Sequence, residues 1–284
     1  MKLVRYGKPG KEKPGLLDSE GLLRDLSGIV DDLAGKGLSP KSLAKIAKAK
    51  ADKLPLVSGK PRIGPCVGQP GNFIAVGLNY ADHAAETGAA IPKEPILFNK
   101  APNCIVGPYD DVMLPRGSEK LDWEVELAIV IGTRASYVSE SAAMSHVAGF
   151  CICNDVSERA YQAERGGQWM KGKSAPTFGP LGPWLVTPDE IPDVQNLAMW
   201  LDVNGGRCQN GSTATMIFNV VQVIAYISHF MTLDPGDIIT TGTPPGVGLG
   251  MKPPRFLKAG DTMSLGIDGL GRQAQRVVAW QKEI

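Results

Sequence analysis

Leu121-Asp122-Trp123-Glu124-Val125-Glu126-Leu127-Ala128-Ile129-Val130-Ile131-Gly132 is the stretch that decides the fold. Residues two apart on a strand share a face, so this stretch places Asp122, Glu124 and Glu126 on one side and apolar residues on the other. From Leu127 onward both faces are apolar, which is typical of a strand buried on both sides. Acids that enter such a strand are costly unless something neutralises them, and carboxylate oxygens are the preferred ligands of a hard cation. The alternative is an exposed, solvated strand face.

A third carboxylate follows a second apolar run. Asp155 comes directly after residues 147–153 and precedes a polar turn. It is either a turn or N-cap residue or a partner of the two glutamates. Three carboxylates at the ends of buried strands fit a Mg²⁺-type site completed by water. Zinc fits less well, because no His or Cys lies at a suitable spacing.

Of the three histidines, His83 is the one placed for chemistry. It follows an apolar run, and if residues 80–87 form a helical turn, His83 and Glu86 are i,i+3 neighbours. A carboxylate beside an imidazole raises its basicity and fixes its tautomer, which suits a general base acting on water. Spacing alone does not separate this interpretation from an incidental surface ion pair. His146 and His229 are interpreted as structural.

Two glycine-containing loops follow. Residues 169–174 carry Lys171 and Lys173, and the pattern by itself indicates an exposed basic turn. Residues 240–250 are glycine-rich and follow a strand, but they lack the spacing of a dinucleotide fingerprint and the Gly-Lys-Ser/Thr of a phosphate loop. What this second loop offers is a set of backbone amides able to hold a small anion.

Composition restricts the protein class. The chain has 284 residues, 43% of them hydrophobic, with 34 Gly and 22 Pro spread throughout, which favours a turn-rich β protein. A net charge of +1 gives no argument for nucleic acid or an anionic membrane surface. No run approaches the ~18 apolar residues of a membrane span. The five cysteines form no CxxC pair and are expected to be reduced thiols in a cytoplasmic protein.

The chain divides into a small N-terminal domain (1–65) and a main domain (66–284), joined by a Pro- and Gly-bearing linker over 59–71. The first unit predicts a short strand at 3–6, a strand entering a turn at 15–21 with its return at 22–26, and then a helix over 41–51 with Ser39 as N-cap and Pro40 at its first position. The main domain predicts strands at 73–76, 123–131, 197–203, 237–241 and 262–267, and helices at 139–146 and 218–231. This pattern indicates a β-rich α+β fold and not alternating βαβ units.

Six segments in this order resemble the fumarylacetoacetate hydrolase family. The resemblance runs from about Phe73 to the C-terminus. Its pieces are Gly77-Leu78-Asn79-Tyr80 with His83 and Glu86; Phe98-Asn99-Lys100; Asp122-Trp123-Glu124-Val125-Glu126-Leu127; Asn154-Asp155-Val156-Ser157-Glu158-Arg159 with Gln162; Gly172-Lys173-Ser174; and Gly242-Thr243-Pro244 with Gly246-Val247-Gly248.

The resemblance implies a mixed β-roll with a small N-terminal α+β domain, assembled as a homodimer. It implies Mg²⁺ or Mn²⁺ as cofactor, with Ca²⁺ an occupant in crystals. The implied roles divide into metal ligands (Glu124, Glu126, Asp155), catalytic groups (His83 and Glu86 on a short closing helix, with Lys173 stabilising enolate charge) and substrate contacts (Lys100, Arg159, Gln162, Thr243). The founding hydrolase has a further acidic ligand where this chain has Val76, so water is expected in its place.

The implied reaction is metal-dependent hydrolysis of a carbon–carbon bond in a 2,4-diketo acid, with water activated by the His/Glu pair. A sugar-derived acid such as 2,4-diketo-3-deoxy-L-fuconate is the substrate that overall resemblance suggests. The alternatives are an oxaloacetate-type decarboxylase or keto–enol isomerase at the same metal, a ureidoglycolate lyase, and a metal-binding β-roll without catalysis. Beyond a keto-acid substrate and a second copy of the chain, neither a nucleic acid nor a membrane is expected as a partner.

Overall fold

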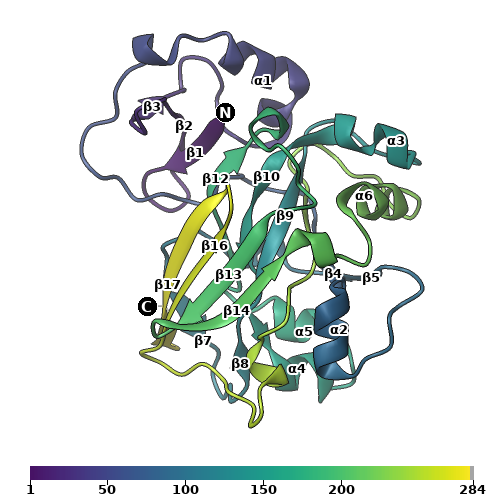
Figure 1. The fold of residues 1–284 in the computed structure, drawn as a ribbon. Coiled ribbons are helices and arrows are strands. Elements are labelled where there is room, and N and C mark those ends of the chain that lie inside the picture. Colours follow the sequence, from purple (N-terminus) through teal and green to yellow (C-terminus); the bar gives the residue numbers. More distant parts are fainter. Residues whose placement is uncertain (282–284) are drawn as a thin grey trace.

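A computed structural model describes residues 1–281 of the chain, and its architecture is the sheet-rich α+β fold that the sequence predicts. A large mixed sheet runs through the molecule in the order β3-β2-β1-β12-β10-β9-β15-β4-β5, with β6 beside β12 (Figure 1). Its strands are β1 (Lys2–Tyr6), β2 (Lys13–Leu17), β3 (Leu23–Asp25), β4 (Phe73–Gly77), β5 (Ile96–Asn99), β6 (Ile105–Val106), β9 (Val125–Ile131), β10 (Val147–Asn154), β12 (Gly179–Val186) and β15 (Ile238–Thr240).

A second, five-stranded sheet packs across the first (Figure 1). Two buried glutamines on β17 help to join the layers: Gln273 Nε2 donates to the carbonyls of Ile152 on β10 (2.8 Å) and Gly182 on β12 (3.0 Å). The second of them, Gln275, donates to the Pro108 carbonyl. The second sheet comprises β7 (Val112–Leu114), β13 (Ala198–Val203), β14 (Gly206–Ser212), β16 (Thr262–Ile267) and β17 (Gly271–Ala279).

The acidic stretch forms two strands and not one. β9 is buried along its whole length, as predicted, but it begins at Val125. Asp122 belongs to β8 (Leu121–Asp122), which pairs with β11 (Ser157–Glu158) in a small separate sheet. The backbone hydrogen-bond ladder is interrupted before β9 because side chains take the place of backbone carbonyls as acceptors. Asn154 Oδ1 accepts the N–H of Glu124, and Gln209 Oε1 accepts the N–H of Val125. Asp122 therefore leaves the row of Glu124 and Glu126.

The helices are short and lie around the edges of the sheets (Figure 1). They are α1 (Pro40–Ala47), α2 (Ala81–Thr87), α3 (Glu140–Ala143), α4 (Arg159–Ala163), α5 (Met170–Lys173) and α6 (Val220–Ser228). Ser39 caps α1 as predicted, but the helix ends four residues early, because the Ala49 N–H turns to the carbonyl of Ile46. A capping box between Asn219 and Gln222 fixes the start of α6. Among residues 1–281, no helix has the length and apolarity needed to cross a membrane.

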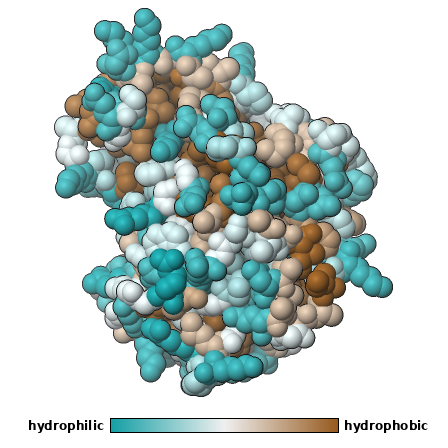
Figure 2. Space-filling model, in the orientation of Figure 1, coloured by the Kyte–Doolittle hydropathy of each residue, from teal (hydrophilic) through white to brown (hydrophobic). Residues whose placement is uncertain are grey.

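The N-terminal unit is joined to the main sheet. β1 pairs antiparallel with β12, with Leu3 opposite Leu185, and β2 and β3 extend the sheet outward. Hydrophilic residues cover much of the face shown in Figure 2, and hydrophobic residues are visible over this upper unit, near the centre and at the lower right. The boundary between residues 65 and 66 stays a prediction.

Candidate active site

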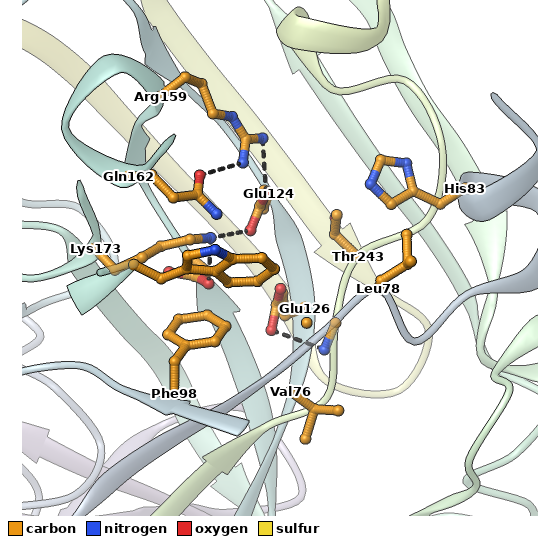
Figure 3. A pocket seen from close by; sticks show the side chains of 14 residues that line it. Val76, Leu78, His83, Phe98, Glu124, Glu126, Arg159, Gln162, Lys173 and Thr243 are labelled. Carbon is orange, nitrogen blue, oxygen red and sulfur yellow. Dashed lines mark hydrogen bonds and ion pairs between the residues drawn. The ribbon is translucent and has the colours of Figure 1, made fainter. Parts of the chain in front are cut away.

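A cavity of about 90 Å³ lies where β4, β9 and β10 end near α2, α4 and α5. Most of the residues singled out from the sequence line it, although they come from segments far apart in the chain. They are His83, Glu124, Glu126, Asp155, Arg159, Gln162, Lys173 and Thr243. The cavity is the place to examine their chemistry (Figure 3).

Three buried carboxylates meet in this cavity. Glu124, Glu126 and Asp155 each place one oxygen within 4.8 Å of the others. The antiparallel pairing of β9 with β10 causes this, since Glu126 lies opposite Cys153 and the Asp155 N–H donates to the Glu124 carbonyl at 2.9 Å. The structure thus brings together the three residues predicted as metal ligands.

Three buried cations partner two of these acids. Lys173 Nζ donates to Glu124 Oε2 (2.6 Å) and Asp155 Oδ2 (2.8 Å), and Lys100 Nζ donates to Asp155 Oδ1 (2.6 Å). Arg159 Nη2 lies 2.7 Å from the other Glu124 oxygen. Burial by itself would raise the pKa of Glu124, but Lys173 and Arg159 outweigh it and lower that pKa to about 2. Glu124 is therefore held ionised.

Within residues 1–281, Glu126 is the carboxyl of the cluster that has no cationic partner. Its one hydrogen bond among the described residues comes from the Gly242 N–H, at 3.0 Å. Burial raises the pKa of Glu126 well above its ordinary value, and the nearby charges of Asp155 and Glu124 raise it further. Glu126 is therefore the acid of the cluster that is ionised only when a further cation, beyond the protein's own lysines and arginine, neutralises it.

The charge balance around the cavity fits a divalent cation. With Glu126 ionised, the four carboxylates of Asp122, Glu124, Glu126 and Asp155 face the cations Lys100, Arg159 and Lys173, which leaves one negative charge. A divalent ion on the three converging carboxylates would turn that excess into one positive charge, which a singly charged keto acid would neutralise. Oxygen donors alone suit Mg²⁺ or Mn²⁺.

His83 and Glu86 form a pair on α2. His83 Nδ1 lies 3.0 Å from Glu86 Oε2, so the second ring nitrogen is free to face the cavity that His83 lines. The Gly246 N–H donates to the Glu86 carboxylate at 3.0 Å and anchors the pair from outside the helix. Figure 3 shows His83 on the opposite side of the cavity from Lys173. The predicted i,i+3 contact is present.

The backbone amides of the glycine-rich loop bind anionic groups, as predicted for a small anion, but these groups are carboxylate side chains of the same chain. Its amides donate to Glu126 (from Gly242), to Glu86 (from Gly246) and to both oxygens of Asp122 (from Gly248 and Leu249). Asp122 also accepts from Arg159 Nε at 2.8 Å. The loop therefore connects the dyad helix to the carboxylate cluster.

The predicted substrate contacts occupy different positions. Arg159 and Gln162 line the cavity and bond to each other, which leaves the Gln162 amide nitrogen available. Thr243 also lines it, but its hydroxyl donates to the Val125 carbonyl. Lys100 is not among the lining residues: it is buried against Asp155, so its placement suits holding that carboxylate and not touching substrate.

Sequence reasoning missed the apolar side of the cavity. Leu78, Phe98 and Trp169 line it together with Val76. Leu78 and Phe98 lie inside the resembling segments, but nothing in their spacing distinguishes a cavity side chain from a core one. The signal that could have found them is chain position, since Leu78 directly follows a buried strand and precedes the helix that carries His83.

Comparison with known proteins gives matches over nearly the whole chain. A family model described as fumarylacetoacetate (FAA) hydrolase C-terminal matches residues 72–278. A curated Burkholderia cenocepacia protein with the general name of hydrolase is 61% identical over 276 residues, which cover 97% of this chain and 98% of that protein.

Solved structures agree. A fumarylacetoacetate hydrolase from the psychrophile Exiguobacterium antarcticum superposes with a TM-score of 0.84 at 36% identity, covering 99% of this chain and 100% of the other. A maleylpyruvate hydrolase from Sphingobium, solved with manganese(II) and pyruvate, gives a TM-score of 0.83 at 27% identity over the same shares of the two chains.

Proposed function

The chain belongs to the fumarylacetoacetate hydrolase family, and from this premise we propose that it hydrolyses the C3–C4 bond of a 2,4-diketo acid. The observation that carries the proposal is the arrangement across one cavity of a His–Glu pair on one side and a lysine with three carboxylates on the other (Figure 3). This arrangement offers a base for water, a cation for an enolate and a site for a divalent ion.

Glu124, Glu126 and Asp155 would hold the ion, with water in place of a fourth carboxylate beside Val76. When bound, Mg²⁺ or Mn²⁺ supplies Lewis-acid polarisation and a template for the 1,2-dioxygen end of the substrate. Manganese(II) and pyruvate are present together in the Sphingobium maleylpyruvate hydrolase, which supports this assignment.

His83 starts the reaction. Its free nitrogen takes a proton from water, and the water oxygen adds to the C4 carbonyl of the substrate. Glu86, 3.0 Å from Nδ1, fixes the tautomer and stabilises the imidazolium that forms. The Gly246 amide keeps Glu86 in this position.

Bond cleavage follows. The C3–C4 electron pair moves to C3, which releases a carboxylic acid and the enolate of pyruvate. Two of the three Lys173 ammonium protons are bound to Glu124 and Asp155, and the third can donate to the enolate oxygen. The imidazolium then returns a proton to C3, so one water is consumed and His83 is regenerated.

Decarboxylation and keto–enol isomerisation at the same site need no attacking water, and ureidoglycolate cleavage would act on a ureido compound in place of a diketo acid. Hydrolysis in ¹⁸O-labelled water separates these reactions, because label enters the acid product only in hydrolysis. An acid product that carries no label would contradict the proposal. The free thiols of Cys66, Cys104 and Cys151 suit the cytoplasm, where we place the reaction.

His83→Ala is the direct test of the base. We expect kcat to fall by about 10²–10⁴ with a panel of 2,4-diketo acids, while the affinity for Mn²⁺ stays unchanged because His83 is not a ligand. His146→Ala is the matched control, since His146 bonds to the Thr133 carbonyl away from the cavity. Unchanged turnover in the His83 variant would contradict its assignment as the base. Activity that persists in the presence of a chelator would contradict the requirement for a metal.

A further inference from the structure

The lining of the cavity has a polar and an apolar part. The carboxylates, Arg159, Gln162 and Lys173 supply the polar part, and Val76, Leu78, Phe98 and Trp169 supply the apolar part, which we call the apolar wall. Figure 3 shows Phe98 below Lys173, Val76 below Glu126, and Leu78 beside Thr243 on the loop that follows β4. The wall is where the acyl part of a substrate would lie if its keto-acid end met the carboxylates.

Leu78 holds its place at a conformational cost. Its φ is +47°, in the left-handed region that a leucine rarely adopts. The next residue fixes this conformation, because the buried Asn79 side chain donates to the carbonyls of Phe218 and Thr241 and accepts the Phe218 N–H. A residue held in a strained conformation beside a cavity indicates a functional reason for its side chain.

The aromatic part of the wall is packed closely. A Cβ at Gly77 would lie 2.4 Å from the Trp169 ring, so the glycine lets the indole lie directly on the β4 backbone. Trp169 in turn contacts Phe98, with ring centroids 5.3 Å apart. The wall is therefore a fixed surface and not a loose collection of side chains.

Few polar groups near the wall are free. Arg159 is bound to Asp122, Glu124 and Gln162, and the Thr243 hydroxyl is bound to Val125 and Gln209. Oxygen atoms of a substrate chain placed against the side chain of Leu78 would lose hydrogen bonds to water and gain only an apolar contact, which is unfavourable.

We propose that Leu78 is a specificity-determining residue that selects 2,4-diketo acids with an unsubstituted aliphatic acyl chain over oxygenated ones. This inference rests on the proposed function and names the substrate class for the same site. The wall thus favours simple acylpyruvates over the sugar-derived diketo acid that overall resemblance suggests.

The test compares two substrates of equal chain length that differ at one position, where one has a methylene group and the other an ether oxygen. In 5-methoxy-2,4-dioxopentanoate an ether oxygen replaces one methylene of 2,4-dioxoheptanoate, and the ether cannot close onto the 2-keto group as a hydroxyl could. For the wild type we expect kcat/KM to favour the all-carbon chain by about tenfold or more. Leu78→Asn should bring this ratio close to one, since Asn is similar in size and polar.

Leu78→Asn should also fold well, because asparagine tolerates positive φ. We expect its Tm to equal or exceed that of the wild type. Gln69→Asn is the matched control: Gln69 has the same φ of +47° but lies away from this cavity, so it should show the same relief of strain and keep the wild-type substrate ratio.

Binding separates this inference from the reaction itself. 2-Oxoheptanoate and 5-methoxy-2-oxopentanoate lack the C4 carbonyl and cannot be cleaved, but they place the same chains on the wall. In the presence of Mn²⁺ the wild type should bind the first about tenfold more tightly, and Leu78→Asn should lose this preference. Equal binding of the two acids, binding of neither, or an unchanged ratio in the variant overturns the inference. Failure of C–C hydrolysis with the binding preference intact overturns only the proposed function.

Discussion

Glu126 differs from the other carboxylates at the site because it is buried among like charges without a cation of its own. The lysines and the arginine bind Glu124 and Asp155 and leave this third carboxyl raised in pKa. An acid in that condition holds a proton until a cation replaces it. Metal binding and proton release are therefore coupled at one residue.

The affinity for Mn²⁺ should rise with pH. With the pKa of Glu126 above its ordinary value, the metal-free protein keeps this carboxyl protonated at a pH where a free glutamate is ionised, so the ion must displace the proton. Calorimetry in buffers of different ionisation enthalpy should detect the released proton. In Glu126→Gln we expect weaker binding with little pH dependence, because the competing proton is gone together with the ligand. An affinity that is constant with pH and releases no proton would contradict this coupling.

At the scale of elements, the glycine-rich loop from Gly242 to Gly250 links the two halves of the site. Its backbone amides contact Glu126, Glu86 and Asp122. Gly246 is essential to its path, since φ is +102° and a Cβ there would lie 2.0 Å from the Cys208 carbonyl oxygen. The loop can approach Glu86 only because this position has no side chain.

Gly246→Ala should be destabilised by about 2 kcal/mol or more in chemical denaturation, and its kcat should fall because Glu86 loses its anchor. Gly260→Ala is the matched control: its φ of +98° is similar, but nothing lies within 4 Å of the added Cβ. The control measures the conformational cost alone. Equal losses in the two variants would show that the collision and the anchor do not matter.

Local sequence patterns predicted several elements well. Ser39 and Pro40 marked the start of α1, and alternation marked Glu124 and Glu126 at the beginning of β9. Alternation failed at Asp122, because whether a ladder continues depends on acceptors such as Gln209, which lies far away in sequence. The apolar wall and the raised pKa of Glu126 were not predictable for the same reason, since both arise from contacts between distant segments.

At the scale of the whole molecule, the described residues include aromatic side chains that are unusually exposed. Tyr137 is 77% exposed and Phe230 is 64% exposed, and they contact His229 and Tyr226 respectively at the end of α6. Clustered exposed aromatic rings are typical of association surfaces. They offer a place where the expected second copy of the chain could bind.

We therefore expect light scattering after size exclusion to give about twice the chain mass of 30.2 kDa. Phe230→Asp should shift the protein toward the monomer, because a charge placed in a buried interface is costly. Leu56→Asp, at a side chain 56% exposed on the N-terminal unit, should leave the dimer intact. A monomeric wild type would contradict the dimer, and a dimeric Phe230 variant would place the interface elsewhere.

The pairing of β1 with β12 has a consequence for protein engineering. The N-terminal strand β1 completes the backbone hydrogen bonding of β12, a strand in the middle of the large sheet that carries the site. The N-terminal portion therefore cannot be exchanged between relatives as an independent cassette. A chimaera has to preserve the register of Leu3 against Leu185. Otherwise β12 becomes an unpaired edge strand that can pair with other chains and cause aggregation.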